Sequence, residues 1–277
     1  MHLIMIVTAL SIACLIRLLP LSRSSWEKRW QRTLFLYLFP PLIIVATILA
    51  VLLMGAQGEM MGMKATQFSY GFSLIFFLAL VLNSVYLWLR AMSACKKVSL
   101  HPVTTFGGSS LRLINSEFPY VAQIGLWQPV LVASSGLIKL LNKSQLEAVL
   151  AHEEAHLYYR DNFCFFLLGL LRRCIWLPNT ETIWEELLLL REIRADLKAA
   201  ETVDPLIIAE SLLAVAQAPT QTSCWEVGFS LPSSNSRLAQ RVEALIDNDT
   251  LPKSPNWAYW SWLMLLFIPL ATVPLHC

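Results

Sequence analysis

Long apolar runs separated by basic segments dominate the hydrophobic pattern of the chain. A helix needs about 20 predominantly apolar residues to cross the hydrocarbon core of a bilayer. Runs close to that length occupy residues 2–21, 33–54, 70–89 and 256–275. Basic residues follow the first run instead of preceding it, which favours a retained helix over a cleaved signal peptide. We therefore expect a mainly α-helical membrane protein with about four transmembrane helices, three within residues 1–97 and one within residues 256–277.

Basic residues beside these runs predict the orientation of the chain. They cluster after the first run (Arg23, Lys28, Arg29 and Arg32) and after the third (Arg90, Lys96 and Lys97). Because cytoplasmic loops of membrane proteins carry an excess of Lys and Arg, both clusters are expected in the cytoplasm. The N- and C-termini then lie outside the cell (inner) membrane, and residues 98–250 lie inside.

From residue 98 to about residue 250 the pattern is that of a smaller α+β domain. Short β-type runs lie at residues 98–100, 111–114, 120–125 and 130–133, with turn residues such as those at 107–110 between them. Helical periodicity covers residues 142–162, a stretch from Thr180 or Thr182 to about Ala200, and residues 203–216 and 236–247. We expect this domain to be inserted between the third and fourth spans.

An apolar stretch from Asn162 to Leu177 falls inside this domain. It is short for a full span, and Arg172 and Arg173 interrupt it. We expect the segment near residues 163–177 to lie in the membrane interface, with both arginines reaching toward water. A full crossing would put the residues before and after it on opposite sides of the membrane.

Overall composition agrees with the membrane class. The chain is 56% hydrophobic and only 14% charged, and its formal net charge of +2 is too small to predict nucleic-acid binding. Its six cysteines are scattered, without a C-x-x-C pair. We interpret them as buried reduced thiols rather than as a disulfide framework or a metal cluster.

The strongest chemical signal is the H-E-x-x-H motif His152-Glu153-Glu154-Ala155-His156. It lies in the expected helix over residues 142–162, whose start shows a capping-box pattern from Ser144 and Glu147. Histidines four residues apart share one helix face, where two neutral imidazoles can bind one Zn²⁺. Glu153 lies about 100° round the helix and can reach a metal-bound water. We favour this catalytic site over a solvated helix face, because unpaired polar groups are costly on a half-buried helix.

A catalytic zinc also needs a third protein ligand and an open position for water. We expect the third ligand to be Glu192, on the helical pattern that begins near Thr180. Asp196 follows one turn later on the same face, where it can accept the outer N–H of a ligating histidine. Glu185 and Glu186 are the rival ligands.

These motifs together resemble those of the integral-membrane zinc peptidases. They look most like the BlaR/MecR-type antirepressor peptidases, with the HtpX and CAAX-prenyl-protease type as more distant relatives. The matching elements are the H-E-x-x-H motif with Arg160-Asp161 after it, Glu192-x-x-x-Asp196, residues 121–132, and Arg237-Leu238-x-x-Arg241-Val242. The resemblance implies a gluzincin-like domain with one Zn²⁺ per chain held by His152, His156 and Glu192. Glu153 is then the catalytic base, and Asp196 and Asp161 orient the ligands.

The resemblance also implies how a substrate is held. A small sheet packs on the motif helix in such peptidases, and an edge strand can bind an extended peptide by β-augmentation. We expect this strand to comprise Tyr120, Val121, Ala122, Gln123, Ile124 and Gly125. The group that stabilises the oxyanion stays open among Arg194, Arg237 and His101, because Leu231 stands before Pro232 where the HtpX type has a histidine. For Arg237 and Arg241 we favour a structural role, in which they pair with acidic residues near the site.

The function implied is that of a membrane-embedded zinc endopeptidase acting on a protein substrate at the cytoplasmic face. By the BlaR/MecR resemblance the expected substrate is a BlaI-type transcriptional repressor. The external sensor of those proteins has no counterpart in this sequence, so a signal would have to come from the spans, the external loop or a partner. A general membrane quality-control protease and a non-hydrolytic metal-binding signal transducer are the alternatives. Glu153 favours catalysis, because a structural zinc site needs no general base.

Overall fold

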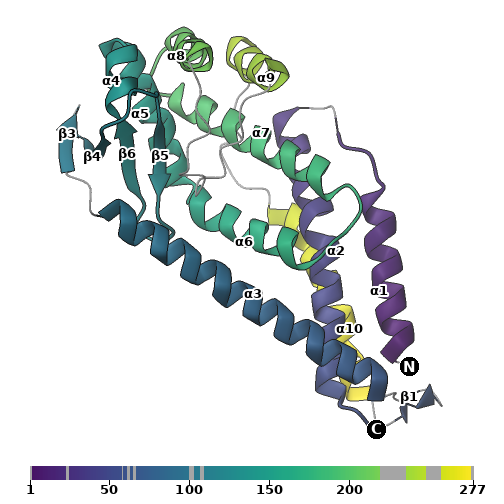
Figure 1. Cartoon of the computed structure of the whole chain (residues 1–277). Coiled ribbons are helices and arrows are strands. Elements are labelled where there is room, and N and C mark those ends of the chain that lie inside the picture. The colour runs from purple at the N-terminus through teal and green to yellow at the C-terminus, as the bar shows by residue number, and fades with distance from the viewer. Residues whose placement is uncertain are drawn as a thin grey trace. The chain divides into compact units, whose positions relative to one another are not determined.

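The computed structural model describes residues 2–22, 25–57, 59–60, 63–64, 67–99, 103–106, 109–218, 235–247 and 257–275. They are mostly helical, with a small sheet (Figure 1). The chain divides into two compact units, one of residues 1–86, 168–187 and 252–277 and one of residues 87–167 and 188–251. Helices α3 (Gln67–Ser99), α6 (Asp161–Cys174) and α7 (Thr180–Ala199) contribute residues to both units.

Apolar helices build the first unit. Helix α1 (His2–Arg17) packs against α2 (Trp26–Met54), which continues without a break through Pro40 and Pro41. The last apolar run folds as η1 (Trp257–Phe267), α10 (Ile268–Ala271) and η2 (Val273–Leu275), largely in 3₁₀ conformation. The segment after α2 contains a short hairpin of β1 (Glu59–Met60) and β2 (Met63–Lys64). The core of this unit includes Ile6, Ala13, Phe39, Ile48, Leu177 and Trp262.

Long apolar helices indicate a membrane protein. Within the described residues, those long and apolar enough to cross a bilayer are Trp26–Met54, Gln67–Ser93 and Ala258–Leu275. Helix α1 has 16 residues, or about 24 Å at 1.5 Å per residue, against a hydrocarbon core of about 30 Å. The helix ends before Pro20, whose ring cannot continue it. The first expected span is therefore shorter than predicted, and the number of spans stays a prediction.

The second unit contains a four-stranded sheet in the order β3-β4-β6-β5. Its strands are β3 (Val103–Phe106), β4 (Ser109–Ile114), β5 (Val121–Ile124) and β6 (Val130–Ser134). Strands β3 and β4 are antiparallel, as are β5 and β6, whereas β4 and β6 run parallel. Strand β5 lies at an edge of the sheet, as predicted for the stretch that begins at Tyr120.

Two predictions about this sheet are wrong. Val98 and Ser99, expected in a strand, form the end of α3 instead, and the first strand of the sheet is β3, which the sequence pattern does not predict. Once a helix has formed, each further residue adds one hydrogen bond at little cost, and no Pro or Gly lies between Gly71 and Val98 to stop it. Ser109 and Ser110, expected in a turn, belong to β4.

Helices on both sides fix the position of α5 (Lys143–Tyr158). Leu146 of α5 packs with Leu137 of α4 (Ser135–Leu140) against Leu111 and Leu131 of the sheet, and Figure 1 shows α4 and α5 beside these strands. Ala148 of α5 packs elsewhere against a core from α7, α8 (Pro205–Gln217) and α9 (Asn235–Ile246). The motif helix is therefore held by the sheet and by four helices, α4, α7, α8 and α9.

The cysteines differ from the expected buried thiols. The thiols of Cys14, Cys164 and Cys174 are free, but Cys164 is exposed and the other two are partly exposed. Cys224 and Cys277 lie outside the described residues, as does the side chain of Cys95.

Candidate metal centre

The motif helix begins with a capping box. The side chain of Asn142 accepts a hydrogen bond from Gln145 N at 2.9 Å, and the Gln145 side chain accepts one from Asn142 N at 3.2 Å. The predicted box of Ser144 and Glu147 is wrong, because Lys143 is already helical and Ser144 lies inside the first turn. Its hydroxyl donates to Asn142 Oδ1 at 2.8 Å instead. The helix start is therefore fixed two residues earlier than the sequence pattern indicates.

Two histidines of α5, one helical turn apart, lie close to a carboxylate of α7. His152 Nε2 lies 3.1 Å from His156 Nε2 and 3.4 Å from Glu192 Oε2. His156 Nε2 lies 3.7 Å from Glu192 Oε1. One ligand atom from each of the three residues therefore lies within 4.8 Å of the others. The structure thus brings the three predicted ligands together.

This donor set fits a zinc ion. Ligands about 2.0–2.1 Å from Zn²⁺ at tetrahedral angles lie about 3.3 Å from one another. The two shorter donor separations, 3.1 and 3.4 Å, bracket that value. Two imidazoles and one carboxylate also make up the ligand set of several catalytic zinc sites, in which water takes the fourth position.

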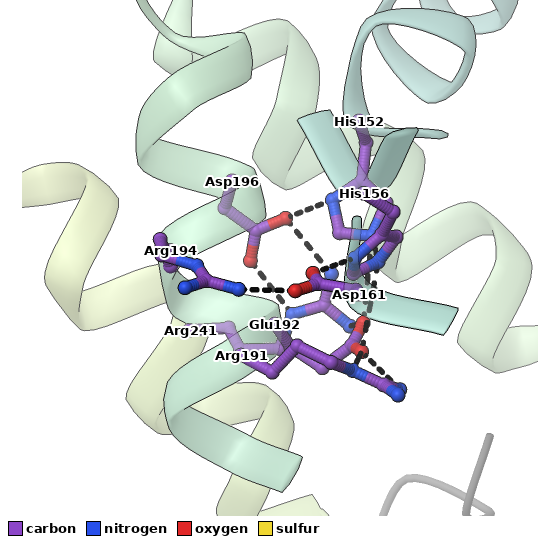
Figure 2. A network of polar contacts seen from close by, with 8 residues as sticks. All are labelled: His152, His156, Asp161, Arg191, Glu192, Arg194, Asp196 and Arg241. Carbon is purple, nitrogen blue, oxygen red and sulfur yellow. Dashed lines mark hydrogen bonds and ion pairs between the residues drawn. The ribbon is translucent and has the colours of Figure 1, made fainter. Parts of the chain in front are cut away.

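Each histidine is held from behind by an aspartate, as Figure 2 shows. His152 Nδ1 lies 2.7 Å from Asp196 Oδ1, and His156 Nδ1 lies 2.8 Å from Asp161 Oδ2. Because the carboxylates occupy the Nδ1 sides, both Nε2 atoms are left to face the site. The residues predicted to orient the ligands therefore contact them directly.

Three arginines anchor the carboxylates in turn (Figure 2). Arg241 of α9 donates to both oxygens of Asp196, at 2.7 and 2.8 Å. Arg194 pairs with Asp161 and stacks over the Tyr159 ring. Arg191 donates twice to Glu192 Oε1, at 3.0 and 2.8 Å. These contacts fix the direction of the Asp196, Asp161 and Glu192 carboxylates.

The charged groups of the site shift the pKa values of His152, Glu192 and Asp196. Burial works to lower the pKa of His152, but the adjacent Asp196 and a contact with Glu192 raise it to about 10. Burial would raise the pKa of Glu192, yet the charges of Arg191 and His156 hold this pKa well below its usual range. Burial likewise opposes ionisation of Asp196, and Arg241 and His152 outweigh it to lower that pKa. Both carboxylates are therefore ionised at neutral pH, as metal ligation and histidine orientation require.

A small cavity of about 70 Å³ opens beside the donor atoms. Glu153 lines it, 7% exposed, together with both histidines. Val121, Ala122 and Gln123 of β5 line it as well. The candidate base, the donor atoms and the sheet edge thus share one cavity.

The structure separates some candidates from the site and adds others. Glu186 and Arg29 both belong to the first unit and pair with each other there, and the described groups that could hold a metal do not include Glu185. Arg194 is engaged with Asp161, whereas His101 and Leu231 lie outside the described residues. Motif spacing gave no signal for two cavity residues, Arg191 and Asn162. Asn162 is adjacent in sequence to Asp161, which is the one hint that it lies near the site.

Comparison with known proteins bears on this region of the chain. No curated protein and no solved structure gives a match. Residues 122–223, which contain β5, the H-E-x-x-H helix and Glu192, match the model of peptidase family M48, a family of zinc metallopeptidases.

Proposed function

We propose that the chain is a membrane-embedded, zinc-dependent endopeptidase that hydrolyses peptide bonds of a protein substrate at the cytoplasmic face. The observation that carries this proposal is the convergence of His152, His156 and Glu192 on one point of a cavity that Glu153 also lines. The match to peptidase family M48 supports metallopeptidase chemistry. The apolar helices support a location in the membrane.

Each residue has a defined part in this reaction. His152, His156 and Glu192 would hold a Zn²⁺ ion, which supplies Lewis acidity and lowers the pKa of a water molecule toward about 7. Glu153 takes a proton from the attacking water and passes it to the nitrogen of the departing amine. Asp196 and Asp161 hold the imidazoles by their Nδ1 atoms, so that both Nε2 atoms stay directed at the site.

The open edge of β5 is the proposed place for the substrate backbone. This strand pairs with β6 on one side only, and Val121, Ala122 and Gln123 line the cavity. A peptide laid along it gains main-chain hydrogen bonds whatever its side chains are. Its scissile carbonyl then comes close to Glu153.

A cytoplasmic transcriptional repressor of the BlaI type is the substrate we favour. The BlaR/MecR-like pattern around Arg160-Asp161 and from Arg237 to Val242 supports this choice. The match to family M48 supports the HtpX and CAAX-prenyl-protease side of the resemblance, so the choice of a BlaI-type repressor rests on these motifs alone. Cleavage of a purified BlaI-type repressor, compared with an unfolded control protein, distinguishes regulated proteolysis from quality control.

The test of the proposal compares wild type with Glu153→Gln, with bound zinc quantified in both. Activity is measured on unfolded β-casein and as self-cleavage. We expect equal zinc and a loss of activity of at least about 100-fold in the variant, because a general base contributes about 10² to 10⁴ in rate. Glu154→Gln is the matched control: Glu154 is exposed, and its loss should leave activity unchanged.

Two results would contradict the proposal. Absence of zinc from both proteins would refute the metal site. Full activity in Glu153→Gln would refute the role of that carboxylate. Equal zinc with no hydrolysis by either protein would favour the metal-binding signal transducer.

A further inference from the structure

The register of β5 against β6 determines which of its backbone groups face outward. Ser134 N donates to Tyr120 O at 2.8 Å. In an antiparallel pair such groups alternate, so Ala122 and Ile124, opposite Val132 and Val130, also turn their backbone groups toward β6. The residues between them turn theirs to the open edge: Val121, Gln123 and Gly125.

Asn162 occupies part of this open edge. Its Nδ2 donates to Gln123 O at 2.7 Å and to Gly125 O at 3.0 Å. Both hydrogens of the amide are therefore used. Because carbonyl oxygens can only accept, the nitrogen must face β5 and the orientation of the amide is fixed.

The oxygen of the same amide remains available. Within the part of the chain that the structure describes, Asn162 Oδ1 has no hydrogen-bond partner, and it is not among the fully buried polar atoms that lack one. Asn162 lines the cavity together with His152 and Glu153. A residue with one unused acceptor and a fixed amide thus stands at the wall of the candidate active site.

Because Asn162 occupies the carbonyl oxygens of Gln123 and Gly125, a bound peptide can pair with fewer backbone groups of this edge. Within β5 itself, Val121 N–H, Val121 O and Gln123 N–H remain open among the described residues. The next backbone acceptor along the edge, Gln123 O, already accepts a hydrogen bond from Asn162 Nδ2. A peptide N–H that would have reached it meets the Asn162 amide instead, whose Oδ1 can accept it.

We propose that Asn162 is a substrate-positioning residue, which ends the usable edge of β5 at Gln123 and offers Oδ1 to one backbone N–H of the peptide. This inference rests on the proposed function and specifies how the substrate is read. The enzyme binds a short extended segment and does not pair with a long strand. Substrates therefore need local unfolding of only a few residues at the cleavage site.

Peptide binding without cleavage tests the proposal. Full-length, zinc-loaded Glu153→Gln protein is titrated against fluorescein-labelled oxidised insulin B chain, with polarisation as the readout. Asn162→Ala, Asn162→Asp and the control Asn115→Ala are each added to this background. Asn115 contacts Ser135 in the turn after β4 and does not line the cavity. Zinc content and melting temperature show whether each variant is folded.

The variants have distinct expected results. Asn162→Ala should weaken binding about fivefold or more, the effect of about one net hydrogen bond, and Asn115→Ala should not. Asn162→Asp should also weaken binding, because a carboxylate cannot donate to Gln123 O and Gly125 O and repels both. Peptides with single N-methylated amides then locate the contact. One position should weaken binding about fivefold, and this effect should vanish in Asn162→Ala.

The outcomes separate this inference from the proposed function. Unchanged affinity in Asn162→Ala, with the same N-methylation profile, overturns the role of Asn162. Absence of peptide binding in every variant overturns β5 as the substrate site. If wild type binds the peptide as described but hydrolyses nothing, the proposed peptidase fails while the role of Asn162 in binding stands.

Discussion

Each histidine of the site begins a chain of three residues that leads away from the cavity. His152 contacts Asp196, which Arg241 holds by both oxygens, and His156 contacts Asp161, which Arg194 holds. Carboxylates behind ligating histidines fix the tautomer and raise the basicity of the ring. The arginines neutralise these buried carboxylates, of which Asp196 is 1% exposed. The site is therefore organised before any metal binds.

This arrangement predicts a pH-dependent stability of the metal-free protein. The pKa of His152 in the folded state is about 10, above the value of about 6.5 expected in the unfolded state. The proton is bound more tightly in the folded state, so its stabilisation is complete below about pH 6.5 and is lost as pH rises toward 10. We expect the melting temperature of chelator-treated protein to fall between pH 7 and pH 10.

Replacement of the neighbouring carboxylate isolates the contribution of His152. In Asp196→Asn the charge that raises the histidine pKa is absent, so the decline in melting temperature should be shallower. Asp204→Asn is the control, since Asp204 caps α8 and asparagine caps a helix equally well. Parallel declines in all three proteins would contradict the assignment.

Local spacing explains why the sequence predicts only part of this site. His152, His156, Glu192 and Asp196 share helix faces at intervals of four residues, so their relation follows from helical geometry. Arg241 lies 45 residues from Asp196, and Asn162 reaches β5 across 39 residues. Such contacts depend on how α9 and α6 pack, which no local pattern contains.

At the scale of elements, α5 shows where such patterns succeed and fail. Its existence and the facing of its histidines follow from periodicity, because the apolar stripe that binds the sheet has the helical period. Its first residue does not, since Asn142 and Ser144 are both good caps and each is followed three residues later by Gln or Glu. The extended backbone at Asn142, with ψ of 173°, and its hydrogen bonds with Gln145 identify the cap in the structure. The apolar run at Val98 is similarly ambiguous between strand and helix in the sequence, and in the structure it continues α3.

Two substitutions at the start of α5 measure this difference. Asn142→Ala removes the acceptor for Gln145 N and should lower the free energy of unfolding by about 1 kcal/mol. Ser144→Ala removes only an exposed hydroxyl contact and should have an effect below about 0.5 kcal/mol. Denaturant unfolding in detergent, followed by circular dichroism, provides the comparison. A larger effect of Ser144→Ala than of Asn142→Ala would contradict the assignment of Asn142 as the cap of α5.

For the whole molecule, the side of the membrane on which the site lies depends on α2 and α3. Both are long enough to cross, whereas α1 at 16 residues is marginal. A failure of α1 to cross would move the N-terminus to the other side, but it would not change the side of the peptidase domain. The basic residues before α2 and at the end of α3 decide that side by the positive-inside rule. The proposal of a cytoplasmic site thus depends on two helices and on the charges beside them.

Reporter fusions test this orientation. Alkaline phosphatase should be active when fused after Gln57 and inactive after Lys97, and a fluorescent protein that folds only in the cytoplasm should give the opposite pattern. Replacement of Arg90 and Lys96 by glutamine in the second fusion should raise its phosphatase activity, because the bias that retains this end inside is weaker. An N-terminal fusion reports separately whether α1 crosses. Phosphatase activity after Lys97 in the unmodified chain would place the metal centre outside, where no cytoplasmic repressor could reach it.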